Sequence, residues 1–143
     1  CLTPRIPGMT ENIRIVSIVG RFLEHSRIYA FGVGEDTKVF IASGDMMTRN
    51  TERRVEVACP IYDRRIRQRL LDMMDLLLRD NVKAREQFAD GRYVLRTPLN
   101  DPPLNAQETF MQQAKEPPET FEWEPVKSDG KKKRRLFGWF GKK

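Results

Sequence analysis

Three consecutive segments decide the fold of this chain: Arg27-Ile28-Tyr29-Ala30-Phe31, Gly32-Val33-Gly34-Glu35-Asp36 and Lys38-Val39-Phe40-Ile41-Ala42. The first and third are rich in β-branched and aromatic residues, which favour strands, and the second is typical of a turn. We therefore predict a β-hairpin. Because a hairpin brings the outer ends of its strands together, the residues before the first strand and after the second should share one end of the sheet.

Helices and a further strand are predicted on both sides of this hairpin. Before it, Thr10 can cap a helix over residues 11–23, whose wide apolar face should be well buried. The alternation of helical and strand patterns predicts an α/β (α+β) fold. The elements predicted after the hairpin are a loop over 43–52, a strand over 54–58 that Pro60 ends, a helix over 63–79 capped by Asp63 and a short helix near 105–115.

The positive charge is concentrated at the C-terminal end. The net charge is +6, and seven of the 26 Lys and Arg residues lie in residues 131–143, which contain no acid. This segment also contains Leu136, Phe137, Trp139 and Phe140, a combination that suits an anionic membrane surface. Binding of polyphosphate or nucleic acid and a disordered solubilising tail are the alternatives, with nucleic acid the least expected. We divide the chain into a domain over 1–115 and a disordered charged tail over 116–143.

Cysteine content and segment lengths exclude several classes of protein. Cys1 and Cys59 are too few for a disulfide framework or a zinc site, which favours a reducing cytoplasm. There is no secretory signal and no apolar run near the ~20 residues that cross a bilayer. Neither of the familiar glycine-rich phosphate-binding motifs, GxxxxGK[ST] and GxGxxG, is present. Because the chain begins directly with Cys1-Leu2-Thr3-Pro4-Arg5, we expect a fragment whose upstream strands are missing.

His25 is the only histidine, and it stands immediately before the predicted hairpin. A lone histidine is more often structural than catalytic, but arginines and carboxylates should surround this one. Imidazole can attack phosphorus or shuttle a proton, and guanidinium groups stabilise charge on phosphate oxygens. The pair Arg54 and Glu56, spaced by two, indicates either a solvated face or a polar site. The residues expected to gather here are His25, Arg27, Asp45, Arg49, Arg54 and Glu56.

Long ordered strings extend this interpretation. Ser17 to Tyr29, Ser43 to Asn50 and Arg53 to Val57 resemble the C-terminal domain of the bacterial long-chain polyphosphate kinases, and the resemblance covers roughly residues 1–96. It implies a phospholipase D-like mixed sheet flanked by helices, incomplete on the N-terminal side of this chain. It also implies reversible transfer of the terminal phosphate of ATP to polyphosphate through a phosphohistidine.

The resemblance implies roles for individual residues. The histidine that becomes phosphorylated belongs to a preceding domain, and His25 matches a second family histidine that faces the nucleotide phosphates and assists catalysis. Arg54 and Glu56 match positions that line the same tunnel. The residues implied to bind ATP or polyphosphate are His25, Arg27, Asp45, Arg49, Arg54 and Glu56.

Cofactor, partners and location follow from the same resemblance. We expect ATP as substrate and Mg²⁺ held mainly by parts of the enzyme outside this chain, with no metal ligand within it. A homo-oligomer is expected for the full-length enzyme, and no kinase activity for these 143 residues alone. The expected location is cytoplasmic, peripheral at the inner membrane if residues 131–143 bind anionic lipid.

Two alternative functions remain. The first is a phospholipase D-type phosphodiesterase. Its pattern fits loosely, because Arg27 stands where that pattern has lysine, the aspartate position falls at Gly32, and Asp45 replaces asparagine. We therefore rank it below the kinase. The second is a non-catalytic piece that binds a polyanion or a membrane.

Overall fold

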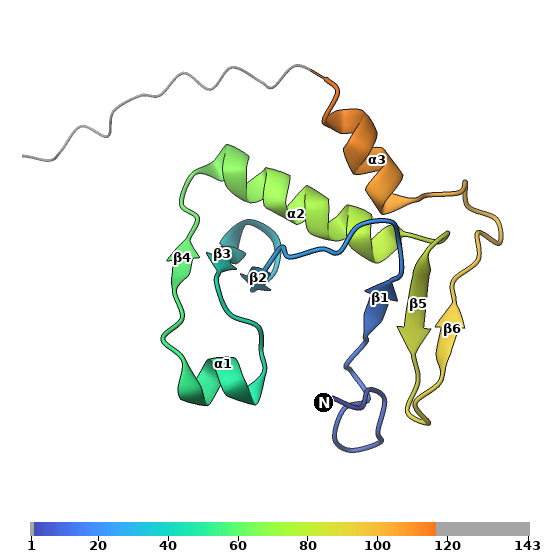
Figure 1. Ribbon diagram of the computed structural model, residues 1–143, viewed down its shortest axis with the longest axis horizontal. Coiled ribbons are helices and arrows are strands. Elements are labelled where there is room, and N and C mark those ends of the chain that lie inside the picture. The colour runs from blue at the N-terminus through green and yellow to red at the C-terminus, as the bar shows by residue number, and fades with distance from the viewer. Residues whose placement is uncertain (1, 117–143) are drawn as a thin grey trace, which may run out of the picture.

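The computed structural model describes residues 2–116, which form two three-stranded antiparallel sheets and three α-helices (Figure 1). The sheet orders are β2-β3-β4 and β1-β5-β6. The predicted α/β class is confirmed, with the strands divided between two sheets. The elements are β1 (Val16–Ile18), β2 (Ile28–Phe31), the 3₁₀ helix η1 (Gly34–Asp36), β3 (Lys38–Ala42), α1 (Thr48–Arg53), β4 (Ala58–Pro60), α2 (Arg64–Arg79), β5 (Ala84–Gln87), β6 (Tyr93–Leu95) and α3 (Ala106–Gln113).

The predicted hairpin is confirmed as β2 and β3, which pair in register from Ile28 opposite Ile41 to Phe31 opposite Lys38. Between the strands, Gly32 has a φ of 103°, a left-handed conformation that residues with a Cβ adopt only with strain. Val39 of β3 is 1% exposed and belongs to the small core. The sequence pattern of this region therefore determines its structure locally.

The long helix α2 links the two sheets, because it runs from the end of β4 to the start of β5 (Figure 1). It begins where predicted. The Asp63 carboxylate accepts hydrogen bonds from the backbone N–H groups of Arg65 (2.8 Å) and Ile66 (3.1 Å), which have no partner within the helix. The short helix predicted near residue 105 is confirmed as α3, which packs against α2.

A buried turn around Asp80 joins α2, β5 and α3. One carboxylate oxygen of Asp80 accepts from the backbone N–H groups of Val82 (3.0 Å), Lys83 (2.7 Å) and Ala84 (3.0 Å). The other oxygen accepts from the N–H of Ala106 at 2.8 Å. Burial on its own would raise the pKa of the Asp80 carboxyl, but these four donors outweigh it and the pKa lies below its ordinary value. The ionised carboxylate therefore holds three elements together.

The helix predicted over residues 11–23 is wrong. Residues 16–18 form β1, which pairs antiparallel with β5, and residues 19–27 connect β1 to β2 without regular structure. The β-branched residues in this stretch suit a strand at least as well as a buried helix. Thr10 caps no helix, because its hydroxyl donates to the carbonyl of Thr3 at 2.7 Å. The expected burial is wrong as well, since Leu23 is 84% exposed.

Two predicted boundaries after the hairpin also change. The loop expected over 43–52 contains the start of α1, and the strand expected over 54–58 is β4, displaced to Ala58–Pro60. Pro60 is the last residue of β4, opposite Phe40. Because β4 lies at the edge of its sheet, a proline without an N–H is tolerated there. The hairpin of β5 and β6 was not predicted.

Among residues 2–116, no helix has the length and hydropathy needed to span a bilayer. The disorder predicted for the tail and the basic aromatic segment over 131–143 concern residues outside the described part of the chain.

Candidate functional site

The outer ends of the hairpin are joined by an ion pair between Arg27 and Asp45. The Nε of Arg27 donates to Oδ1 of Asp45 at 2.7 Å, and its Nη2 donates to Oδ2 at 3.4 Å. The remaining Nη1 donates to the backbone carbonyl of His25 at 3.4 Å. As the hairpin geometry predicted, the segment before β2 and the loop after β3 therefore lie together.

Three basic side chains act on the Asp45 carboxylate. The hydrogen bond from Arg27 is the main reason that the pKa of Asp45 lies below its ordinary value, and the charges of Arg49 and His25 lower that pKa further. The same ion pair raises the pKa of Arg27. Both partners are therefore charged at neutral pH. His25 and Arg49 have exposed side chains, and Arg49 lies on α1.

Glu56 is held by two polar neighbours from the preceding loop. The hydroxyl of Ser43 donates to Glu56 Oε2, and the Nδ2 of Asn50 donates to Oε1 at 2.8 Å. These bonds, that from Ser43 first, keep the pKa of Glu56 below its ordinary value. A Cβ at Gly44 would lie 2.8 Å from Cγ of Glu56, so a larger residue would displace the carboxylate. Within the described chain, the buried Oδ1 of Asn50 has no hydrogen-bond partner.

A groove of about 560 Å³ runs over this loop and one face of the sheet β2-β3-β4. Asp45, Arg54 and Glu56 contribute its charged groups, and Tyr29 and Phe40 are among its aromatic ones. The groove brings together three of the six predicted site residues. Arg27 adjoins it through Asp45, while His25 and Arg49 are not among its lining residues.

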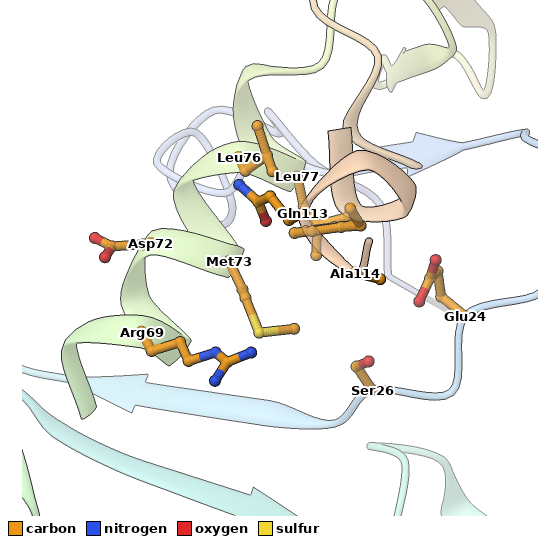
Figure 2. Close-up of a pocket in the computed structure, with 10 residues that line it drawn as sticks. Glu24, Ser26, Arg69, Asp72, Met73, Leu76, Leu77, Gln113 and Ala114 are labelled. Atoms are coloured by element: carbon orange, nitrogen blue, oxygen red, sulfur yellow. The ribbon is translucent and has the colours of Figure 1, made fainter. Parts of the chain in front are cut away.

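A second cavity, of about 490 Å³, lies between α2, α3 and the two residues that flank His25 in the sequence. Figure 2 shows the side chains of Glu24 and Ser26 facing Met73 and the guanidinium of Arg69 across this space. The residues before and after His25 therefore line a cavity other than the groove.

Two arginines suit phosphate oxygens: Arg54, which lines the groove, and Arg49, which precedes the lining residue Asn50 in the sequence. Arg49 and Arg54 form no ion pair with a described carboxylate, so their guanidinium donors are available to phosphate oxygens. Within residues 2–116, no group of three or more His, Cys, Asp or Glu side chains can hold a metal ion.

Sequence reasoning missed the side chains that hold the site in place. Ser43 and Asn50 are polar residues near the two ends of the segment between β3 and α1, and their bonds to Glu56 depend on the conformation of that segment. Gln107, on α3, hydrogen-bonds the backbone of Phe22, 85 residues away in sequence. No local pattern indicates such a contact.

Comparisons with known proteins agree on one family. Residues 1–107 match the family described as polyphosphate kinase C-terminal domain 2. A polyphosphate kinase of Halalkalibacterium halodurans is 49% identical over 116 residues, covering 80% of this chain and 16% of that protein. One of Staphylococcus saprophyticus is 43% identical over 143 residues, covering 99% of this chain and 20% of that protein. The chain thus spans a fifth or less of the length of these relatives.

A solved structure extends the similarity to the fold. The crystal structure of the polyphosphate kinase from Porphyromonas gingivalis superposes with a TM-score of 0.75 at 36% sequence identity. The match covers 80% of this chain and 18% of that one. The arrangement of two small sheets and their helices is therefore shared with a polyphosphate kinase.

Proposed function

The chain belongs to the polyphosphate kinase C-terminal domain family, and from this premise we propose that it forms one wall of the site at which a polyphosphate kinase transfers the terminal phosphate of ATP reversibly to polyphosphate. The observation that supports this most is the grouping of Arg27, Arg54, Asp45 and Glu56 at the end of the hairpin that His25 precedes. ATP and polyphosphate present the anionic oxygens that such guanidinium groups bind.

In the proposed reaction His25 faces the nucleotide phosphates. Its exposed imidazole can donate a proton to a phosphate oxygen or stabilise the charge that develops during transfer. Arg27 has a different task, because each of its three guanidinium nitrogens donates to Asp45 or to the carbonyl of His25. It holds the backbone of His25 relative to the loop that follows β3.

Arg49 and Arg54 supply the charge that the phosphates need. Their guanidinium groups form no ion pair with a described carboxylate, so they bind the equatorial oxygens of the transferred group or the polyphosphate chain. Glu56 lies beside Arg54 and is kept ionised by Ser43 and Asn50. Its negative charge limits how strongly the groove retains an anionic product.

The remaining components lie outside the described residues. In the proposed enzyme, Mg²⁺ is held mainly by parts outside this chain. The full-length enzyme is a homo-oligomer, and the domain over 1–115 is followed by a separate tail. It is cytoplasmic, and residues 131–143 bind it peripherally to the anionic inner membrane surface. Co-sedimentation with anionic vesicles, at several salt concentrations, tests this last part; equal binding with and without residues 131–143 would refute it.

The activity is tested with the complete enzyme that contains this chain. Incubation with ATP and Mg²⁺ should produce acid-labile phosphate chains, and ADP with polyphosphate should yield ATP. The isolated 143 residues should produce neither, because the phosphohistidine belongs to a preceding domain. Hydrolysis of a phosphodiester without ATP, or no reaction at all, would contradict the proposal.

A further inference from the structure

Residues 19–27 connect β1 to β2 and contain His25, but they form no strand or helix. The segment is bonded to the sheets at its two ends. Between those ends, side chains bond its backbone: Gln107 bonds Phe22, and Arg27 bonds His25. The position of His25 therefore depends on side chains on either side of it.

Gln107 makes the more extensive of these contacts. Its Nε2 donates to the carbonyl of Phe22 at 2.8 Å, and its Oε1 accepts from the N–H of Phe22 at 3.0 Å. The same Nε2 donates to Oε1 of Glu24 at 3.3 Å. The side chain of Gln107 is 5% exposed, so both backbone groups of Phe22 are satisfied by one buried amide. This replaces the ladder bonds that a neighbouring strand would provide.

The surrounding residues are adapted to this contact. A Cβ at Gly20 would lie 2.7 Å from Cδ of Gln107 and closer still to its Oε1, so glycine is needed for the amide to reach Phe22. Gln107 is the second residue of α3. The first, Ala106, is bonded to the buried carboxylate of Asp80 at 2.8 Å. The contact is therefore fixed by Gly20 in the connecting segment and by the bond of Ala106 to Asp80 at the start of α3.

We propose that Gln107 is a positioning residue for the phosphate transfer, holding the backbone three residues before His25 so that the imidazole is presented to the nucleotide phosphates. This inference rests on the proposed function. A buried amide with a purely structural task would affect stability alone. Catalytic groups, by contrast, must be placed to within a fraction of an ångström, and a displacement of about 1 Å costs on the order of 100-fold in rate.

The test uses the complete enzyme with Gln107→Ala, Gln107→Met, which keeps the side-chain length without the amide, and the control Gln112→Ala. Gln112 is exposed on the same helix. Both Gln107 variants should lower kcat by about 10- to 100-fold with a change in KM for ATP below about threefold. Amide exchange in residues 19–27 should become faster. Gln112→Ala should change neither kcat nor the rate of amide exchange in residues 19–27.

A double-mutant cycle with Gly20→Ala sharpens the test. Gly20→Ala should lower kcat as Gln107→Ala does, because its methyl group displaces the amide, and it should add little in the Gln107→Ala background. Additive losses, unchanged exchange in residues 19–27, or full kcat in a folded Gln107→Met enzyme would overturn the inference. Full activity of His25→Ala would instead overturn the proposed function, so the two failures are distinguishable.

Discussion

Two aspartates, Asp80 in the buried turn after α2 and Asp45 at the end of the hairpin, carry the same carboxylate in very different surroundings. Asp80 is completely buried, and its carboxylate accepts from four backbone N–H groups, two in the connection after α2, one in β5 and one in α3. Asp45 lies at the end of the hairpin with 44% of its side chain exposed, and its main partner is the guanidinium of Arg27. The pKa of each carboxyl lies below its ordinary value, for different reasons.

Because their partners differ, the two carboxylates are expected to matter for different properties, Asp80 for folding and Asp45 for the proposed chemistry. A carboxylate bonded to backbone N–H groups fixes the course of the chain, and its removal leaves buried donors unsatisfied. A carboxylate bonded to a half-buried arginine at the end of the hairpin orients one cation and changes the local charge. We therefore expect substitutions around Asp80 to affect stability first, and substitutions around Asp45 to affect turnover first.

Asp80→Ala should have the largest effect on stability. It leaves four N–H donors without their acceptor, which at about 1 kcal/mol each amounts to on the order of 4 kcal/mol. Urea denaturation compares it with Asp90→Ala, in which an exposed turn loses its bonds to Arg92. Asp90→Ala should cost much less. Equal losses in the two variants would show that the Asp80 turn does not join the three elements.

Asp45→Asn should reverse this pattern. The neutral amide binds Arg27 less firmly, so we expect kcat of the complete enzyme to fall about 10-fold while the thermal midpoint changes little. Asp36→Asn in the exposed η1 helix is the matched control. A large fall in the thermal midpoint with unchanged kcat would show that Asp45, like Asp80, stabilises the fold and does not affect turnover.

The pH dependence of stability should reveal the ionised Asp80 carboxylate by a smaller effect. The pKa of Asp80 is lower in the folded state than the unfolded value of about 3.9. Its contribution is therefore fully present above about pH 5 and is lost as the pH falls through the folded pKa. The stability difference between wild type and Asp80→Asn should shrink below about pH 4. A difference that is constant down to pH 2 would contradict this assignment.

Local patterns predicted the elements that depend on neighbouring residues. The β2–β3 hairpin and α2 were found because their strand and turn residues, and the cap Asp63, lie within a few positions of one another. β1 was taken for a helix because its partner β5 lies about 70 residues further along. The strand predicted over 54–58 was displaced because Glu56 bonds Ser43 and Asn50.

In the candidate site, too, some contacts follow from local sequence patterns and others depend on residues far apart in the sequence. The ion pair of Arg27 with Asp45 follows from the hairpin, which places the two strand ends together. The contacts of Gln107 with Phe22 and of Asp80 with Ala106 do not follow from any local pattern in the sequence. They depend on how α3 packs, and residues far apart in sequence meet there without a repeating pattern.

Much apolar surface remains uncovered in the described residues. Val33 and Val55 are almost fully exposed, whereas the buried apolar residues are Val39, Ala84 and Ala106. The relatives are five or more times longer than this chain. Contacts with the rest of the enzyme are therefore expected to contribute to the stability of this domain.

The most direct test of the account is the initial rate of ATP-dependent polyphosphate synthesis by the complete enzyme with His25→Ala. His25 has an exposed side chain, so the substitution should leave the thermal midpoint nearly unchanged. We predict a loss of at least about 100-fold in kcat, the scale of a missing acid–base or charge-stabilising group. Synthesis at the wild-type rate by a folded His25→Ala enzyme would contradict the central claim that this chain presents His25 to the nucleotide phosphates.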